Sequence, residues 1–507
     1  MSENEMGTLS RILSGSTVVL AGSIVNKIIA FAGSVFIARL LGDVGYGVVV
    51  VALSVYFIFS NLLTLGLSGG IARNYPQADT DRERRGILVT AFRLGAAVGT
   101  LGGVVVFLAA DPIATHIFGD PSISLPLRLL ASILPLKVAL NLANGSFQAV
   151  KKPAIKMAIS SIIQPVARIL LIVALVLAGF GAAGVAGAYA IAIATAAVLS
   201  LYYVWQYTTL FDFGRPAKIV YKPLLAFSIP LVGSTILVRL MNNIDTLLLG
   251  ALAASADVGQ YNVAFVLGQT TLLFLQTLGF MYVPEISELH ADDRIERAGM
   301  VYRAITKWVL FISAPFILTA VAFPTYVVTF IYSGQYVTAS VPFLVLIGGF
   351  VTHILNGPNH STLTAFGDTR QIFVFDAMTM VLNVVLNLSL IPRFGIAGAA
   401  TATATAYLVR NAAMTWYLHS VYDIQPFSRW LLIPLAPVVL VAGILRWVVP
   451  EPSLPFVIGY ALILVITITF GYLSSGIEEA DLILSELIEE NTGVDLKLVK
   501  RIHEGLR

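Results

Sequence analysis

The chain has 507 residues, of which 57% are hydrophobic and only 12% charged, and its formal net charge is +3. Soluble domains carry roughly a quarter of charged residues, so this composition excludes a water-soluble globular protein. The absence of cysteine excludes disulfides, thiol catalysis and cysteine-bound metals. A mean hydropathy of +0.87 instead indicates a chain that lies mostly within a membrane.

The first 15 residues do not have the features of a cleaved targeting peptide. They carry Glu3, Glu5 and Arg11 where a basic segment would stand, and no small-residue cleavage site follows a short apolar core. We therefore expect the first apolar run to be an uncleaved membrane helix.

Apolar runs of about 20 residues follow one another along the chain, the length that a helix needs to cross roughly 30 Å of hydrocarbon. They predict an all-α membrane protein with about fourteen spanning helices and short loops. The predicted spans are 14–38, 46–70, 86–109, 125–148, 156–178, 185–206, 222–250, 259–283, 303–324, 338–364, 372–391, 397–419, 430–449 and 455–475. Pro135, Pro165, Pro230 and Pro315 lie within spans, where proline can kink a helix.

Basic residues are distributed unequally between the two ends of these spans. With an even number of spans, 21 of the 31 lie on the side of the termini and four on the opposite side, namely Arg39, Arg128, Arg393 and Arg446. Because loops rich in Lys and Arg stay in the cytoplasm, both termini are predicted to be cytoplasmic. Residues 477–507 mix apolar and charged side chains and are predicted to form an amphipathic tail on that side.

Short motifs recur along the chain at a nearly constant offset of 213 to 216 residues. The paired segments are 43–47 and 257–261, 64–66 and 277–279, 118–119 and 333–334, and 180–184 and 394–398. This repetition predicts two six-helix lobes, residues 1–210 and 211–425, followed by an appended helix pair at 426–476. Since each repeat has an even number of spans, we expect a pseudo-two-fold axis along the membrane normal with a cavity between the lobes.

Six basic residues lie inside predicted spans, where a charge at a helix centre costs about 2.5–3.5 kcal/mol on insertion scales. Arg93 is near a cytoplasmic end and can reach the surface. The other five are candidates to bind an anionic headgroup in the cavity: Lys27, Arg239, Arg168, Lys137 and Arg410. Pairing with a buried acid is the structural alternative for each of them.

Acidic residues are scarcer inside the spans. The first six spans contain none, whereas Asp245 and Asp376 lie in the second predicted lobe. Both are candidates for ion or proton coupling, or else they balance a buried base. Asn383 and Asn387 are among several asparagines expected to form hydrogen bonds between helices. The resulting excess of positive charge favours a phosphate-bearing substrate over a cationic drug.

Several segments together resemble the polysaccharide transporters of the multidrug/oligosaccharidyl-lipid/polysaccharide exporter superfamily, and in particular its Wzx-like oligosaccharide flippases. They are residues 38–47, 227–231, 243–250, 258–261 and 391–400. The resemblance covers the chain to about residue 475. It implies a flippase that moves an oligosaccharide linked to polyprenyl phosphate or pyrophosphate from the cytoplasmic to the outer leaflet of the plasma membrane by alternating access.

Other functions stay open at this stage. A multidrug or cation antiporter of the same superfamily would have twelve helices and acids in the first lobe, and a peptidoglycan lipid-precursor flippase would have fourteen helices. A membrane glycosyltransferase would need a carboxylate pair on an aqueous loop, and the short loops offer only the charged stretch 285–297. We therefore expect no enzymatic activity, catalytic residues, metal or cofactor. Expected partners are the lipid-linked glycan, membrane lipids and glycan-assembly enzymes, and no nucleic acid.

Overall fold

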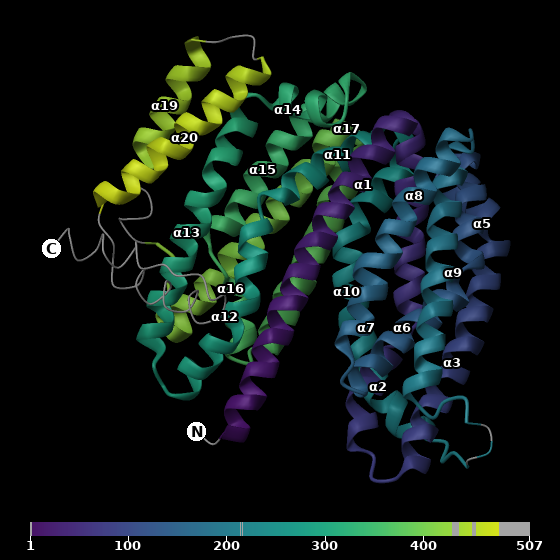
Figure 1. The fold of residues 1–507 in the computed structure, drawn as a ribbon. Helices are drawn as coiled ribbons and strands as arrows, with labels where there is room; N and C mark the ends of the chain where they lie inside the picture. The colour runs from purple at the N-terminus through teal and green to yellow at the C-terminus, as the bar shows by residue number, and fades with distance from the viewer. Residues whose placement is uncertain (1–2, 213, 215, 428–434, 449–452, 476–507) are drawn as a thin grey trace. The chain divides into compact units, whose positions relative to one another are not determined.

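The computed structural model describes residues 3–212, 214, 216–427, 435–448 and 453–475 (Figure 1). These residues form helices, turns and loops but no β-strand. Within them, seven helices are long and apolar enough to cross a membrane, or eight if one bent pair is a single span. The prediction of an all-α multi-pass membrane protein is confirmed. The count of fourteen spans remains a prediction, and the predicted tail at 477–507 lies outside the described residues.

Contacts divide the chain into two units. The N-unit contains Ala21–Asn262 and Asn387–Ile396, and the C-unit contains the described residues of Met1–Leu20, Val263–Leu386 and Ala397–Arg507. The predicted lobe boundary at residue 210 falls inside the N-unit, which also includes the helix that was expected to begin the second lobe. The two lobes and their symmetry remain a prediction.

The N-unit is built from helices joined by short turns. They are α1 (Glu3–Leu63, from Ala21 onward), α2 (Leu67–Gln77), α3 (Asp81–Leu108), α4 (Ala110–Pro112), η1 (Ile113–Ile117), η2 (Pro121–Ile123), α5 (Ser124–Ser132), α6 (Leu134–Ala149), α7 (Pro153–Met157), η3 (Ala158–Ile163), α8 (Gln164–Leu177), α9 (Gly181–Tyr207), α10 (Tyr221–Leu252) and the first half of α11 (Ser255–Thr270), whose second half belongs to the C-unit.

The C-unit continues with longer helices and short connections. They are α12 (Leu273–Ala291), α13 (Ile295–Ala322), α14 (Pro324–Ile331), η4 (Gly334–Ala339), α15 (Ser340–Leu355), α16 (Asn359–Ala365), α17 (Thr369–Tyr422), α19 (Leu435–Val448) and α20 (Leu454–Ser475). The predicted spans 259–283 and 338–364 are therefore each interrupted by a short break, between α11 and α12 and between α15 and α16.

Helix α17 consists of two antiparallel halves joined by a tight turn. Its backbone leaves helical geometry at Gly395, whose φ of 54° lies in the left-handed region that glycine adopts readily. Side-chain pairs before and after the turn follow antiparallel register: Asp368 with Tyr422, Asp376 with Arg410, and Asn383 with Thr403. The halves correspond to the predicted spans 372–391 and 397–419.

Helix α1 bends in a comparable way at Gly42, which has a φ of 70°. The hydroxyls of Ser34 and Tyr46 are hydrogen-bonded at 2.8 Å across this bend. Gly181 has a φ of 53°, nearly the value of Gly395, its equivalent in the predicted repeat. Equivalent positions of the repeat thus share a backbone geometry that favours glycine.

Two copies of the recurring motif also pack against each other inside the N-unit. A Cβ atom added to Gly47 would lie 1.7 Å from the Ser255 carbonyl oxygen, and one added to Gly259 would lie 2.2 Å from the Asp43 carbonyl oxygen. The Gln260 side-chain amide donates to the Asp43 carboxylate at 3.2 Å. Only glycine allows backbones to approach so closely, as at other small-residue crossings of membrane helices.

Proline 135 lies at a break between α5 and α6, which are bent by 45° relative to each other. Proline cannot donate the backbone hydrogen bond that would continue the preceding helix, so the predicted span 125–148 is kinked rather than straight. The appended helices α19 and α20 lie beside α13 in the C-unit (Figure 1). There, the Tyr460 ring packs edge-on against Phe323 with centroids 5.1 Å apart.

Candidate functional site

Two of the predicted cationic residues lie on a pair of touching helices in the N-unit. A Cβ atom on Gly33 of α1 would be 3.8 Å from the Ile169 side chain of α8. Arg168 is the neighbour of Ile169, and Lys27 lies less than two turns before Gly33. The Arg168 guanidinium stacks over the Tyr189 ring of α9 at 4.7 Å, which orients its half-buried side chain by a cation–π contact.

The third base, Lys137, belongs to a polar face of α6. Asn141 and Asn144 follow it at the four- and three-residue spacing that places side chains on one side of a helix. Asn141 donates to the Thr64 hydroxyl at 3.0 Å, just beyond the end of α1. Asn144 accepts from the Ser160 hydroxyl at 3.2 Å, in the short helix that leads into α8.

The polar face of α6 therefore contacts the segment just after α1 and the short helix that leads into α8. Lys27 is exposed, whereas Lys137 and Arg168 are half-buried. No acidic residue occurs in the first six predicted spans to neutralise them. We name Lys27, Lys137 and Arg168 the cationic triad. Arg239 lies on α10 in the same unit, but its side chain is outside the described part of the structure.

Asp245 of α10 is a buried carboxylate with a side-chain exposure of 5%. The Tyr261 hydroxyl donates to its Oδ2 at 3.0 Å, and the Asn387 amide donates to its Oδ1 at 2.7 Å. Both donors are uncharged side chains that solvate the carboxylate. Such a group can gain stability by taking up a proton or a cation, which suits the predicted coupling role.

The second pair of candidates, Asp376 and Arg410, lies in the C-unit and forms a salt bridge. The Nε and Nη2 atoms of Arg410 both donate to Oδ1 of Asp376 at 2.7 Å. Their side chains are only 8% and 12% exposed, so both charges are largely removed from water. In this conformation each residue balances the other, which was the structural alternative for both.

The contacts of the two asparagines agree with their expected use between helices. Asn387 reaches Asp245 on α10, and Asn383 donates to the Thr403 hydroxyl at 3.5 Å across the α17 hairpin. The hydrogen bond from Tyr261 to Asp245 could not be predicted from the sequence, because the two residues are 16 positions apart and lie on different helices. The only sequence signal for Tyr261 is its place in the recurring motif at 257–261.

Solved structures identify the class of fold. The chain aligns with "Lipid II flippase MurJ, inward closed conformation" over 94% of its own length and all of that chain, with a TM-score of 0.71 and 12% identity. It also aligns with "Inward-facing conformation of a multidrug resistance MATE family transporter of the MOP superfamily", over 78% of its length and 94% of that chain, with a TM-score of 0.66 and 15% identity. The protein thus has the helical fold of MOP-superfamily membrane transporters.

The chain belongs to the family described as "Polysaccharide biosynthesis protein", whose model matches residues 12–290, just over half of the sequence. The MatE model matches residues 230–389. Both matches confirm the resemblance to polysaccharide transporters of this superfamily that the motifs indicated.

Two curated relatives resemble part of the chain. One is "Probable low-salt glycan biosynthesis flippase Agl15" of Haloferax volcanii, 25% identical over 185 residues, which are 36% of this chain and 38% of the relative. The other is "Stage V sporulation protein B" of Bacillus subtilis, 23% identical over 163 residues, which are 32% of this chain and 31% of the relative. The chain thus spans about a third of the length of the relatives it matches.

Proposed function

We propose that this protein is a flippase that moves a lipid-linked oligosaccharide from the cytoplasmic to the outer leaflet by alternating access. Membership of the polysaccharide biosynthesis family and partial similarity to a glycan flippase support this function. The observation that carries it is the cationic triad, three bases in the first six predicted spans, which contain no acid, with Lys27 and Arg168 on the contacting helices α1 and α8.

The triad supplies what a polyprenyl phosphate or pyrophosphate headgroup requires. A guanidinium can donate two parallel hydrogen bonds to phosphate oxygens, and an ammonium adds a compact charge. In a partly buried site these contacts are less screened than in water. The headgroup would bind Lys27, Lys137 and Arg168 while the sugar occupies the aqueous cavity and the lipid tail stays in the bilayer. Arg239 is proposed as a further ligand on α10.

Transport in proteoliposomes tests this function directly. The purified protein should move a fluorescent oligosaccharide linked to polyprenyl pyrophosphate, measured by access of an external quencher to the sugar. Each of Lys27→Gln, Lys137→Gln and Arg168→Gln should lower the rate at low substrate concentration by about tenfold, since one charge-assisted contact contributes about 1.5–3 kcal/mol. The matched control is Arg294→Gln, an arginine 58% exposed on a loop, which should transport normally.

Two outcomes would contradict the proposal. A wild-type protein that ignores the anionic lipid but exports organic cations would be an antiporter of the same superfamily. Preference for the peptidoglycan lipid precursor over other polyprenyl-linked sugars would instead assign it to precursor flippases.

We propose Asp245 rather than Asp376 as the coupling residue. Asp245 is buried and accepts hydrogen bonds from Tyr261 and Asn387, whereas Asp376 forms a salt bridge with Arg410. Asp245→Asn should therefore abolish the acceleration of transport by an imposed sodium or proton gradient and leave the slow gradient-independent rate. Equal acceleration in wild type and variant would exclude this role.

The finer topology is also a proposal: a plasma-membrane protein with cytoplasmic termini, no enzymatic activity, and glycan-assembly enzymes as partners. The excess of basic residues on the side of the termini supports it. Because the chain has no cysteine, single-cysteine variants can be labelled without background. In intact cells a membrane-impermeant maleimide should label Ser122→Cys and spare Asp292→Cys, and the opposite pattern would invert the topology.

A further inference from the structure

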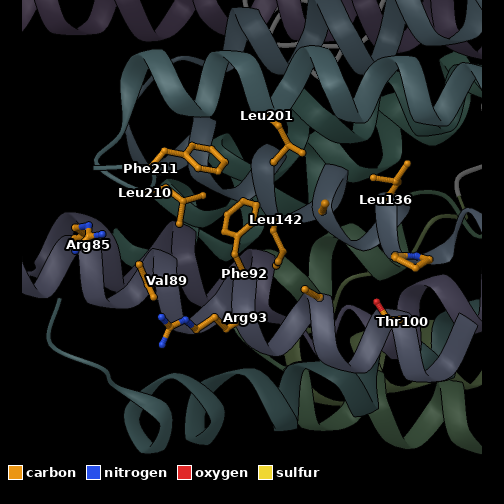
Figure 2. A pocket seen from close by; sticks show the side chains of 13 residues that line it. Arg85, Val89, Phe92, Arg93, Thr100, Leu136, Leu142, Leu201, Leu210 and Phe211 are labelled. Atoms are coloured by element: carbon orange, nitrogen blue, oxygen red, sulfur yellow. The ribbon is translucent and has the colours of Figure 1, made fainter. Parts of the chain in front are cut away.

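An elongated apolar groove runs along α3 in the N-unit, apart from the cationic triad (Figure 2). Its volume is about 460 Å³, within the range of about 300–1,000 Å³ that is usual for small-molecule sites. Val89, Phe92, Ala96 and Thr100 line it at the spacing of one helix face. From Arg85 to Thr100 this face extends about 22 Å at 1.5 Å per residue, and about 10 Å of it lies beyond Arg93, enough for part of a lipid chain.

The groove exists because α3 carries glycine on one face and small side chains on the next. A Cβ atom at Gly95 would lie 2.6 Å from Leu142, and one at Gly99 would lie 3.3 Å from the Pro135 Cα atom, so α6 approaches closely there. Beside this crossing, the short side chains of Ala96 and Ala139 leave space that larger residues would fill. The groove is therefore a consequence of the α3–α6 packing.

Two arginines stand toward one end of this apolar surface, as Figure 2 shows, with Thr100 and Leu136 at the other. Arg85 is only 7% exposed, and its Nε donates to the Thr209 carbonyl oxygen at 3.1 Å. Arg93 is exposed, and among the described residues no ion pair or hydrogen bond holds its guanidinium. This end is the cytoplasmic one in the predicted topology.

The segment between α9 and α10 closes this end of the groove with Leu210 and Phe211. It is fastened to α3 by main-chain contacts, since Lys218 N donates to the Arg82 carbonyl oxygen at 3.1 Å. The Lys218 ammonium also pairs with Glu83 at 2.8 Å. These contacts hold Leu210 and Phe211 in a fixed position relative to the arginines of α3.

The groove faces away from the proposed transport site. On α6 it is lined by Pro135, Leu136 and Ala139, whereas Lys137 and Asn141 belong to the polar face that turns toward α1 and α8. A headgroup bound by the triad would therefore not be continuous with a chain in this groove.

We propose that this groove binds one anionic phospholipid of the cytoplasmic leaflet, with the phosphate at Arg93 and part of an acyl chain along α3 toward Thr100. Charge complementarity selects the headgroup, because two guanidiniums adjoin a surface that is otherwise almost wholly apolar. The length and apolar lining of the groove select the chain. The inference goes beyond the proposed function and does not depend on the transported substrate.

Lipid titration of the purified full-length protein, followed by native mass spectrometry, tests the site. Phosphatidylglycerol should bind saturably, and phosphatidylcholine with the same acyl chains should bind at least tenfold more weakly. Arg93→Gln should weaken phosphatidylglycerol binding about tenfold, the loss expected for one charge-assisted contact, while Arg93→Lys retains most of it. Ala96→Trp should block the chain, and Arg294→Gln, an exposed arginine elsewhere, should bind as wild type.

A photoreactive phosphatidylglycerol places the bound chain. Labelling should map to the peptides of α3 and α6 and should be lost in Ala96→Trp. If Ala96→Trp fails to fold, the loss of labelling in Arg93→Gln provides the same test. Equal binding of phosphatidylcholine, or labelling unaffected by both variants, would overturn the proposal. So would displacement of phosphatidylglycerol from these peptides by a lower concentration of polyprenyl phosphate, since the groove would then hold the substrate's carrier.

Discussion

The N-unit and the C-unit treat buried and half-buried charge in opposite ways. In the N-unit, Lys27, Lys137 and Arg168 lie in predicted spans that contain no acid. In the C-unit, the guanidinium of Arg410 is joined to Asp376 at 2.7 Å and both side chains are nearly buried. We propose the first three bases as ligands of the substrate, whereas the salt bridge gives Arg410 a part in the fold.

The comparison teaches that an intramembrane base indicates function only when its partner is known. A paired guanidinium stabilises an already buried acid, and removal of either member leaves a charge uncompensated. A base that faces a polar or hydrated surface destabilises the fold less when it is present, and its removal also changes the stability less. Substitutions in the two units should therefore affect stability and transport in different proportions.

The largest expected effect is on the Asp376–Arg410 pair. Arg410→Gln leaves the Asp376 carboxylate buried without its counter-charge, which should destabilise the fold by about 3–5 kcal/mol. Heating the purified protein and measuring the fraction that remains monodisperse would detect this loss. The double variant Asp376→Leu with Arg410→Leu should recover most of the stability; equal damage in both variants would show that the pair does not account for the effect.

A smaller effect is expected at Asp245. Tyr261→Phe removes one of the two neutral donors to this carboxylate and should cost about 1.5–3 kcal/mol, the contribution of a hydrogen bond to a charged group. Thermal unfolding measures the change, and the same substitution in an Asp245→Asn background should be much milder. If both backgrounds lose the same amount, Tyr261 stabilises the fold by packing rather than through the carboxylate.

A weaker effect still is expected in the cationic triad. Arg168→Gln loses the stacking contact with Tyr189 and should reduce stability by only about 0.5–1 kcal/mol. Its effect on transport should exceed its effect on stability, the reverse of Arg410→Gln. Unfolding and transport measured on the same preparations would decide this. A large loss of stability would place Arg168 with the structural bases and remove it from the triad.

The smallest effect belongs to the surface pair of Glu83 and Lys218. The hydrogen bond and charge of Lys218 lower the pKa of Glu83 below its usual value. The pair's stabilisation is therefore fully present above the ordinary glutamate pKa of about 4.3 and is lost as pH falls through the lower folded-state value. Melting temperatures of wild type and Lys218→Met should differ slightly at pH 7 and converge below about pH 4. A gap that persists at acid pH would show that the ion pair is not its source.

Much of the architecture follows from local features of the sequence. Apolar runs of membrane-spanning length require helices, because the bilayer offers no water to satisfy an open backbone. Glycine readily adopts the left-handed conformation that a reversal needs, and Gly42 and Gly395 do reverse the chain inside segments that are otherwise helical. The kink at Pro135 was foreseeable for the same reason, since a proline cannot complete the hydrogen bonding of the preceding turn.

Contacts between side chains of different helices were harder to predict from the sequence. Residues 376 and 410 are 34 positions apart, and only the α17 hairpin brings their side chains into register. Asp245 meets Asn387, 142 residues away, and Tyr261, 16 residues away. Sequence spacing along one helix predicts which side chains share a face, but the neighbouring helix that this face meets depends on the packing of the whole unit.

The sequence alone determined the class of this protein: a polytopic helical membrane protein whose first six predicted spans carry bases without acids. These properties depend on composition and order, which every conformation shares. Tertiary structure decided which base forms a salt bridge, which side chains contact Asp245, and where α3 and α6 leave an apolar groove. Those outcomes depend on distances of a few ångströms between side chains from different helices, and Coulomb energies, hydrogen bonds and close packing all change steeply over such distances.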